Sequence, residues 1–271
     1  MSSMIEQPTP ELPHLGFRRY LPHPQLQLWV QSYWVAHQFN LPGEGFTETL
    51  YPDGGISLTF SFRNCDFNDS VPNIEFKTKQ TTSKIYIQES IDSMGIRFNP
   101  GGVFKLFNID MNDMSSANDE PDILKQELGD IPLRLTELNN HNARLLIIEN
   151  WLLEKLYQRN PSPSLLQYFV PKLLHTNIQF DELIKQEAIS RRQLERKFQQ
   201  EIGLSPAQLK QLHRVKQARE YISKNPVRSL TDIALDCGFY DQAHFIRHFQ
   251  KITGQTPGQY KHRKMSQIYN S

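Results

Sequence analysis

Two short stretches of the sequence gather side chains that can make paired hydrogen bonds. The first follows Ser190 and holds Arg191, Arg192, Glu195 and Arg196. The second follows Tyr240 and holds Gln242, Ala243, His244 and Arg247. Arginine bonds a guanine edge through two hydrogen bonds, glutamine does so with adenine, and glutamate accepts from a cytosine amino group. These residue types suit contacts with the base edges of double-stranded DNA, provided that a helix presents them together.

The two stretches belong to an internal repeat. Residues 189–208 and 240–259 align without a gap at an offset of 51. The matched pairs are Leu194 with Phe245, Arg196 with Arg247, Phe198 with Phe249, Gly203 with Gly254, Pro206 with Pro257 and Gln208 with Gln259. A repeat of this kind indicates two copies of one supersecondary unit.

Each copy is predicted to be a helix-turn-helix. In the second copy, helical patterns cover residues 231–237 and 241–251, and Gly238 between them suits a left-handed turn. The first copy has no glycine at the matching place, so its turn must be built differently. One helix-turn-helix pattern is weak evidence for DNA binding, but two in tandem are strong evidence.

Capping residues mark where these helices begin. Ser190 and Gln193 are spaced for a capping box. Pro206 and Pro257 each follow Ser or Thr, at a first helical position where the missing N–H does no harm. Residues 206–223 contain no helix breaker and are predicted to form one long helix between the copies. Its apolar face holds Leu209, Leu212, Val215 and Ala218.

The charges divide the chain into an acidic and a basic part. Residues 1–160 carry 13 Lys and Arg against 20 Asp and Glu, and residues 161–271 carry 17 against 9. Only the second part attracts a polyanion such as DNA. Because a Pro/Ser stretch at 160–164 interrupts the helical pattern, we expect two domains, residues 1–157 and 163–271.

The N-terminal part is predicted to be mainly β, as a barrel or sandwich of the cupin-like kind. Ile56, Leu58 and Phe60 alternate with polar residues after a Pro-Asp-Gly-Gly turn, and residues 93–99 alternate in the same way. From residue 142 the period becomes helical. Leu145, Ile148, Leu152 and Leu156 share one face of this helix, whereas Arg144, Glu149 and Lys155 lie elsewhere. That face packs on its own domain or pairs with a second copy in a homodimer. The whole fold class is then α+β in two domains, the second all-helical.

Several strings resemble the DNA-binding domain of the AraC/XylS family. They are S-x-R-x-L-x-R-x-F from Ser190, G-x-S-P from Gly203, I-A-x-x-x-G-F from Ile233 and F-x-x-x-x-G-x-T-P-x-x-Y from Phe249. The similarity spans about residues 163–263. It implies a bacterial transcription regulator of the activator type, with two recognition helices in successive major grooves and RNA polymerase as a partner. By position, Arg192, Glu195, Arg196, Gln242, Ala243 and Arg247 correspond to the family's usual base-facing sites; Ala243 departs from the longer polar residue often found there.

The N-terminal part is expected to sense a small-molecule effector. Arg97 lies on a predicted strand and is a candidate for holding an anionic effector; the alternatives are a surface arginine or one paired with a carboxylate. An architectural DNA binder without an effector is another reading. We expect a location in the cytoplasm and on the nucleoid, because no long apolar run or secretion signal occurs.

An enzyme is not expected. Alkyl-repair proteins that share the DNA-binding domain need four cysteines, and this chain has only Cys65 and Cys237. A cupin-type metal enzyme needs a close histidine pair with a carboxylate, but His14, His23 and His37 are scattered and no H-x-H occurs. The sequence therefore predicts no catalytic residue, no metal ligand and no cofactor.

Overall fold

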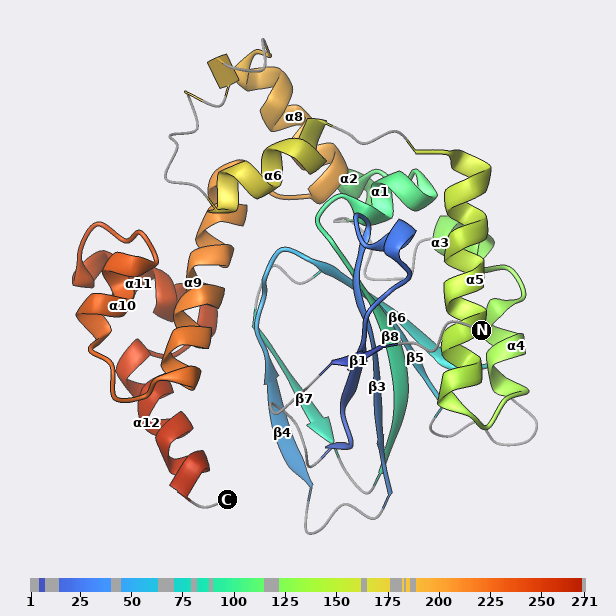
Figure 1. The fold of residues 1–271 in the computed structure, drawn as a ribbon, viewed down its shortest axis with the longest axis horizontal. Coiled ribbons are helices and arrows are strands. Elements are labelled where there is room, and N and C mark those ends of the chain that lie inside the picture. Colours follow the sequence, from blue (N-terminus) through green and yellow to red (C-terminus); the bar gives the residue numbers. More distant parts are fainter. Residues whose placement is uncertain are drawn as a thin grey trace.

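The computed structural model confirms a β-rich N-terminal part followed by a helical part (Figure 1). It describes residues 5–7, 15–39, 45–62, 71–78, 82–87, 90–114, 122–161, 165–175, 182, 184–185 and 189–269. The turn at 186–188 in the first repeat copy, the stretch 162–164 and Cys65 lie outside the described residues. None of the described helices is long and apolar enough to cross a membrane.

Two antiparallel sheets form the N-terminal part. Six strands lie in the order β1-β2-β3-β8-β5-β6, and β4 pairs with β7. Their bounds are β1 Glu6–Gln7, β2 Arg18–Tyr20, β3 Val30–Gln38, β4 Phe46–Leu50, β5 Ile56–Ser61, β6 Asn73–Thr78, β7 Ser83–Ile87 and β8 Ile91–Phe98. Both alternating stretches of the sequence are strands, and they are neighbours: Ile56 lies opposite Phe98 on the adjacent strand.

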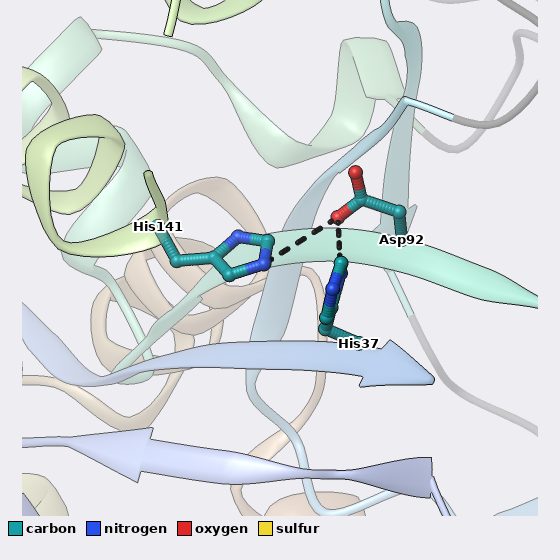
Figure 2. Close-up of side chains that lie close together, drawn as sticks. All are labelled: His37, Asp92 and His141. Carbon is teal, nitrogen blue, oxygen red and sulfur yellow. Dashed lines mark hydrogen bonds and ion pairs between the residues drawn. The ribbon is translucent and has the colours of Figure 1, made fainter. Parts of the chain in front are cut away.

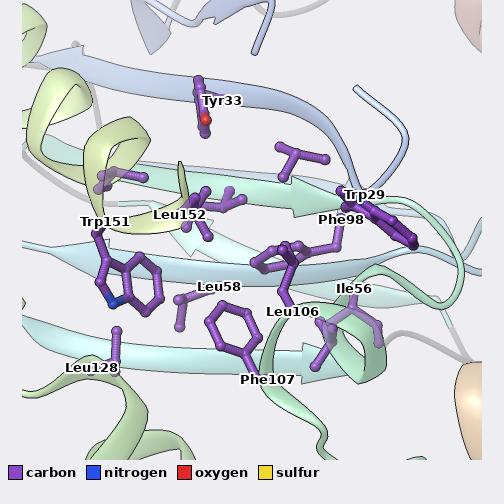
Figure 3. Close-up of a cluster of buried hydrophobic side chains, with 14 of the residues drawn as sticks. Trp29, Tyr33, Ile56, Leu58, Phe98, Leu106, Phe107, Leu128, Trp151 and Leu152 are labelled. Carbon is purple, nitrogen blue, oxygen red and sulfur yellow. The ribbon is translucent and has the colours of Figure 1, made fainter. Parts of the chain in front are cut away.

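Helices cover the large sheet and complete its core. They are α1 Gly102–Phe107, α2 Met111–Met114, α3 Asp122–Leu128, α4 Ile131–Thr136 and α5 His141–Arg159. Leu58, Phe98 and Phe107 have at most 1% of their surface exposed. Phe107 stacks on Trp151 of α5 with ring centroids 5.2 Å apart, and Figure 3 shows these side chains filling the space between sheet and helices.

The predicted apolar face of α5 is buried in its own domain. Leu145, Ile148 and Leu152 are completely buried in the core described above. A homodimer through this helix would therefore have to use another side of it.

Two charged residues that lie off the apolar face of α5 are nevertheless buried. Arg144 and Glu149 are 5% and 9% exposed. The Arg144 Nε donates to the backbone oxygen of Leu135 over 2.9 Å, and its guanidinium lies 3.6 Å from the centre of the Phe62 ring. Glu149 accepts a hydrogen bond of 2.7 Å from the backbone N–H of His23. Periodicity alone assigns charged residues to the surface, but these partners offset the cost of burial.

The helical part consists of two lobes joined by one helix, α9. Its helices are α6 Leu165–His175, α8 Arg191–Ile202, α9 Pro206–Lys224, α10 Leu230–Asp236, α11 Gln242–Thr253 and α12 Pro257–Tyr269. In the first lobe, α6 and α8 pack on the start of α9, and in the second lobe α10, α11 and α12 pack on its remainder (Figure 1). The long helix predicted over residues 206–223 is thus confirmed.

The predicted caps are also confirmed. Ser190 with Gln193 and Ser205 with Gln208 form capping boxes at the starts of α8 and α9. Gln259 completes the same arrangement by accepting from the backbone N–H of Thr256 over 2.8 Å. Gly238 between α10 and α11 has a φ of +73°, the left-handed conformation that the short turn requires.

The repeat places Phe198 and Phe249 at equivalent positions in the two lobe cores, and both are fully buried. We expect Phe198→Ala and Phe249→Ala each to lower the free energy of unfolding by about 3 to 5 kcal/mol, because each leaves a cavity the size of an aromatic ring. Urea unfolding followed by circular dichroism measures this. Tyr240→Ala is the control, since that side chain is 89% exposed. A change in either phenylalanine variant no larger than in this control would show that the core assignment is wrong.

Candidate nucleic-acid interface

The first predicted recognition helix, α8, presents its predicted polar set to solvent. Arg191, Arg192 and Arg196 are exposed, and Glu195 is half-buried. Arg191 Nε lies 3.1 Å from Glu195 Oε1, one turn further along the helix. An exposed pair of this kind is worth less than about 1 kcal/mol, so both side chains can exchange this contact for one with DNA.

The second recognition helix, α11, presents fewer polar groups. Gln242, Ala243 and Arg247 are exposed. His244 is half-buried, because its ring packs against Phe239 and His248 with centroids 5.7 Å and 4.3 Å away. Among the residues predicted from the sequence, His244 is therefore the one most engaged within its own lobe.

A neighbouring histidine that the sequence reasoning missed supports α11. His248 lies 3.4 Å from Gln211 Nε2 on α9 and forms the other half of the ring pair with His244. Burial lowers the pKa of His248, and His244 and the cations Lys251, Arg247 and Arg214 lower it further. His248 is thus neutral at neutral pH, whereas Arg247 and Lys251 on the same helix carry positive charge.

The helix α9 sets the spacing between the two recognition helices. It contains 19 residues, which at a rise of about 1.5 Å each make a rod of roughly 28 Å. Successive major grooves on one face of DNA are about 34 Å apart. The lobes sit toward opposite ends of this rod (Figure 1), so its length is comparable with the groove spacing.

A turn of the N-terminal part docks on α9, which the sequence analysis did not predict. Asp53 forms an ion pair with Arg97 of β8, and its Oδ2 lies 3.2 Å from Lys216 Nζ on α9. Arg97 Nη1 also donates to Ser57 Oγ over 2.8 Å. Burial lowers the pKa of Arg97 to about 10 and lowers that of Lys216. Of the alternatives stated for Arg97, pairing with a carboxylate is therefore the one that the structure shows.

Further contacts surround this ion pair. The Tyr51 hydroxyl accepts from Gln255 Nε2 and Arg263 Nη2, both over 2.7 Å. The guanidinium of Arg219 on α9 lies 3.9 Å from the centre of the Tyr51 ring. Gly54 has a φ of +82°, and an added Cβ would lie 2.4 Å from Leu209 Cδ1, so only glycine lets the turn approach α9 this closely.

The helices α1 and α2 add a second contact between the two parts, because both pack against α8. An added Cβ at Gly203, just after α8, would lie 3.2 Å from Met111 Cβ on α2. The C-terminal end of α8 is therefore held by the N-terminal part. Its N-terminal end, which carries Arg191 and Arg192, remains exposed.

The one cysteine within the described residues has no access to reactive chemistry. Cys237 is 2% exposed and free of any disulfide. Burial raises the pKa of its thiol to about 12. A protonated, buried thiol is neither a nucleophile nor a metal ligand.

Comparison with known proteins agrees with this geometry. A family model for a helix-turn-helix domain matches residues 183–263, and one for a domain of unknown function (DUF6597) matches residues 18–118. The regulator GbdR of Pseudomonas aeruginosa is 30% identical over 165 residues, which are 56% of this chain and 44% of that protein. The XylDLEGF operon transcriptional activator 3 of Pseudomonas putida is 25% identical over 240 residues, which are 85% of this chain and 67% of that protein.

The chain is thus similar to transcription regulators of the AraC/XylS family. The chain spans less than half the length of GbdR. Among solved structures, it is similar to an AraC-type DNA-binding domain from Chromobacterium violaceum at 26% identity and a TM-score of 0.32, over 36% of this chain and 86% of that one. ToxT of Vibrio cholerae is 12% identical with a TM-score of 0.40, over 85% of this chain and 97% of that one.

The contact of Asp53 with Lys216 predicts energetic coupling between the N-terminal part and the helical part of the protein. In a double-mutant cycle, Asp53→Ala and Lys216→Ala should show a coupling energy of about 0.5 to 3 kcal/mol. Asp53→Ala alone should cost more than Lys216→Ala, because it leaves Arg97 as a buried charge without its carboxylate.

Urea unfolding of the four proteins measures this coupling. The exposed pair Asp130 and Arg134, 3.9 Å apart on α4, provides the control cycle, with an expected coupling of about 0.3 to 0.5 kcal/mol. A coupling across Asp53 and Lys216 that is no larger than the control would mean that the turn does not hold α9.

Proposed function

We propose that this protein is a sequence-specific DNA-binding transcription regulator. The observation that carries this proposal is the pair of equivalent helices, α8 and α11, fixed on one rigid helix with Arg196 and Arg247 exposed at the same point of each. In the proposed complex the two helices enter successive major grooves on one face of the duplex. The basic charge of residues 161–271 attracts DNA, and the exposed arginines make the contacts.

The proposed binding surface consists of eight residues on the two helices. On α8 they are Arg191, Arg192, Glu195 and Arg196, and on α11 they are Gln242, Ala243, His244 and Arg247. We expect α8 to contribute more of the base reading. Three of its arginines are exposed, whereas α11 has a short alanine and a half-buried histidine at two of its four positions.

Control by a small-molecule effector acting on the N-terminal part belongs to the same proposal. The docking of the Asp53 turn on α9 supports this part of the proposal. A movement of β8 would displace Arg97 and Asp53, and through Lys216 it would displace α9, the helix that sets the spacing between α8 and α11. Recruitment of RNA polymerase and residence on the nucleoid in the cytoplasm follow from the proposed activity. The relative from Pseudomonas putida is named as an operon activator, which favours activation over purely architectural binding.

A DNA-repair or other enzymatic role finds less support. Cys237, a cysteine that a repair activity could use, is buried with its thiol protonated. We therefore propose a regulator without catalytic activity.

The division into domains at 1–157 and 163–271 is tested by limited proteolysis. The C-cap of α5, Asn160, is exposed and has a left-handed φ of +41°, and Pro161 follows it. We expect early cleavage near Asn160 that releases two fragments, each with cooperative unfolding, as separately folded domains would show. First cleavage at another site, or fragments that do not refold, would place the boundary elsewhere.

Substitution of the two equivalent arginines tests the proposed function. Arg196→Ala should relax sequence preference in one half of the binding site and Arg247→Ala in the other, each by about 1 to 3 kcal/mol if the contact is to a base. The two affected halves should be centred about 10 base pairs apart. If a contact is to phosphate, affinity falls for all sequences and the slope of log affinity against log salt decreases by about one.

Binding to a randomised-site library at two salt concentrations separates these cases. Arg134→Ala is the matched control, because this exposed arginine lies on α4 in the N-terminal part. The proposal would be falsified if both recognition-helix variants stayed folded and bound DNA with the affinity, preference and salt slope of the control.

A further inference from the structure

Three residues that are far apart in the sequence meet at one end of the two central strands of the large sheet. His37 comes from β3, Asp92 from the neighbouring strand β8 and His141 from the first position of α5. Figure 2 shows both imidazole rings directed at the same carboxylate. Each residue offers one ligand atom, and these three atoms lie within 4.8 Å of one another. In the sequence His37 is one of several scattered histidines, because His141 and Asp92 come near it only in the fold.

The distances within this cluster suit an ion between the side chains better than direct hydrogen bonds. His37 Nδ1 lies 3.3 Å from Asp92 Oδ1, and His141 Nε2 lies 3.8 Å from the same oxygen. Direct N–H···O bonds have distances of about 2.7 to 3.2 Å. Tetrahedral ligands at about 2.0 to 2.2 Å from a zinc ion are separated by roughly 3.3 to 3.6 Å from one another. The two observed nitrogen–oxygen distances, 3.3 Å and 3.8 Å, lie at and slightly above this ligand–ligand spacing.

The surroundings orient Asp92 so that one oxygen is left for the histidines. Arg144 Nη1 lies 3.5 Å from Asp92 Oδ2, the oxygen away from His37 and His141. Partners of this kind fix the orientation of a ligating carboxylate in known metal sites. The positive charges of Arg144 and Arg18 near the cluster oppose a cation, so we expect a site of moderate affinity.

The access of solvent to the cluster also fits a metal site. The side chains of His37, Asp92 and His141 are 31%, 22% and 17% exposed. An ion can therefore enter, and water can complete its coordination.

We propose that His37, Asp92 and His141 bind a divalent transition-metal ion of the zinc class, with one coordination position open to solvent. Two histidines and one carboxylate are a known ligand set for zinc with such an open position. The ion joins three elements, because its ligands come from β3, β8 and the start of α5. It therefore stabilises the attachment of α5 to the sheet.

Zinc binding by the full-length chain tests the proposal. The protein is prepared without a polyhistidine tag, stripped with a chelator and titrated with zinc chloride by calorimetry. We expect saturable binding of one ion per chain and a rise in melting temperature. His37→Gln, His141→Gln and Asp92→Asn should each weaken binding more than about 100-fold, beyond the roughly 10–100-fold that loss of an outer partner costs.

Two controls separate the proposed site from other binding. His262→Gln removes an exposed histidine on α12 and should leave zinc affinity unchanged. Cobalt in place of zinc should give visible d–d bands without a thiolate charge-transfer band, because no cysteine is a ligand. These bands should disappear in Asp92→Asn, whose side chain keeps its volume.

The alternative is a purely structural cluster in which the histidines pair with Asp92 without an ion. In that case the three variants lower the melting temperature of the chelator-treated protein, while zinc binds neither wild type nor variants specifically. This result, or zinc affinity that is equal in wild type and the three variants, overturns the proposal. DNA binding by Arg196 and Arg247 does not enter the test, so the two proposals can fail separately.

Discussion

The apolar face of α9 is the constraint on which the helical part depends. One end of this face, with Leu209 and Leu212, is buried in the first lobe. The other end, with Val215, Ala218 and Ile222, is buried in the second. Because one rigid helix supplies core residues to both lobes, neither lobe can turn about α9 without exposing apolar surface. The separation and the relative direction of α8 and α11 are therefore fixed by packing before DNA is present.

The same helix carries the contacts with the N-terminal part. Lys216 reaches Asp53, Arg219 covers the ring of Tyr51, and Leu209 lies against Gly54. The helix α9 thus sets the spacing between α8 and α11 and also contacts the Asp53 turn. A displacement of the turn relative to β8 must either break the ion pairs of Asp53 or move α9. This is the physical reason for placing the proposed effector control at the turn rather than at the proposed DNA-binding surfaces, which face solvent.

The sequence predicted what local chemistry determines. The capping boxes at Ser190 and Ser205 and the left-handed Gly238 each depend on residues within one or two helical turns. The burial of Phe198 and of Phe249 likewise follows from the apolar spacing within its own helix. The alternating strands β5 and β8 were predicted for the same reason. Repetition of the pattern at a fixed offset then identified the tandem helix-turn-helix. No contact between distant segments is needed for any of these conclusions.

The sequence did not predict the contacts that join distant segments through charge. Asp53 meets Lys216 across 163 positions of sequence, and His37 meets Asp92 across 55. Periodicity assigns each charged side chain separately, and an isolated charge belongs at the surface because its burial is costly. Arg144 shows the rule failing: it is buried against Leu135, Phe62 and Asp92 together. Burial of a charge requires partners that only the fold brings near. Sequence patterns therefore could not predict the contact of the Asp53 turn with α9 or the cluster at Asp92.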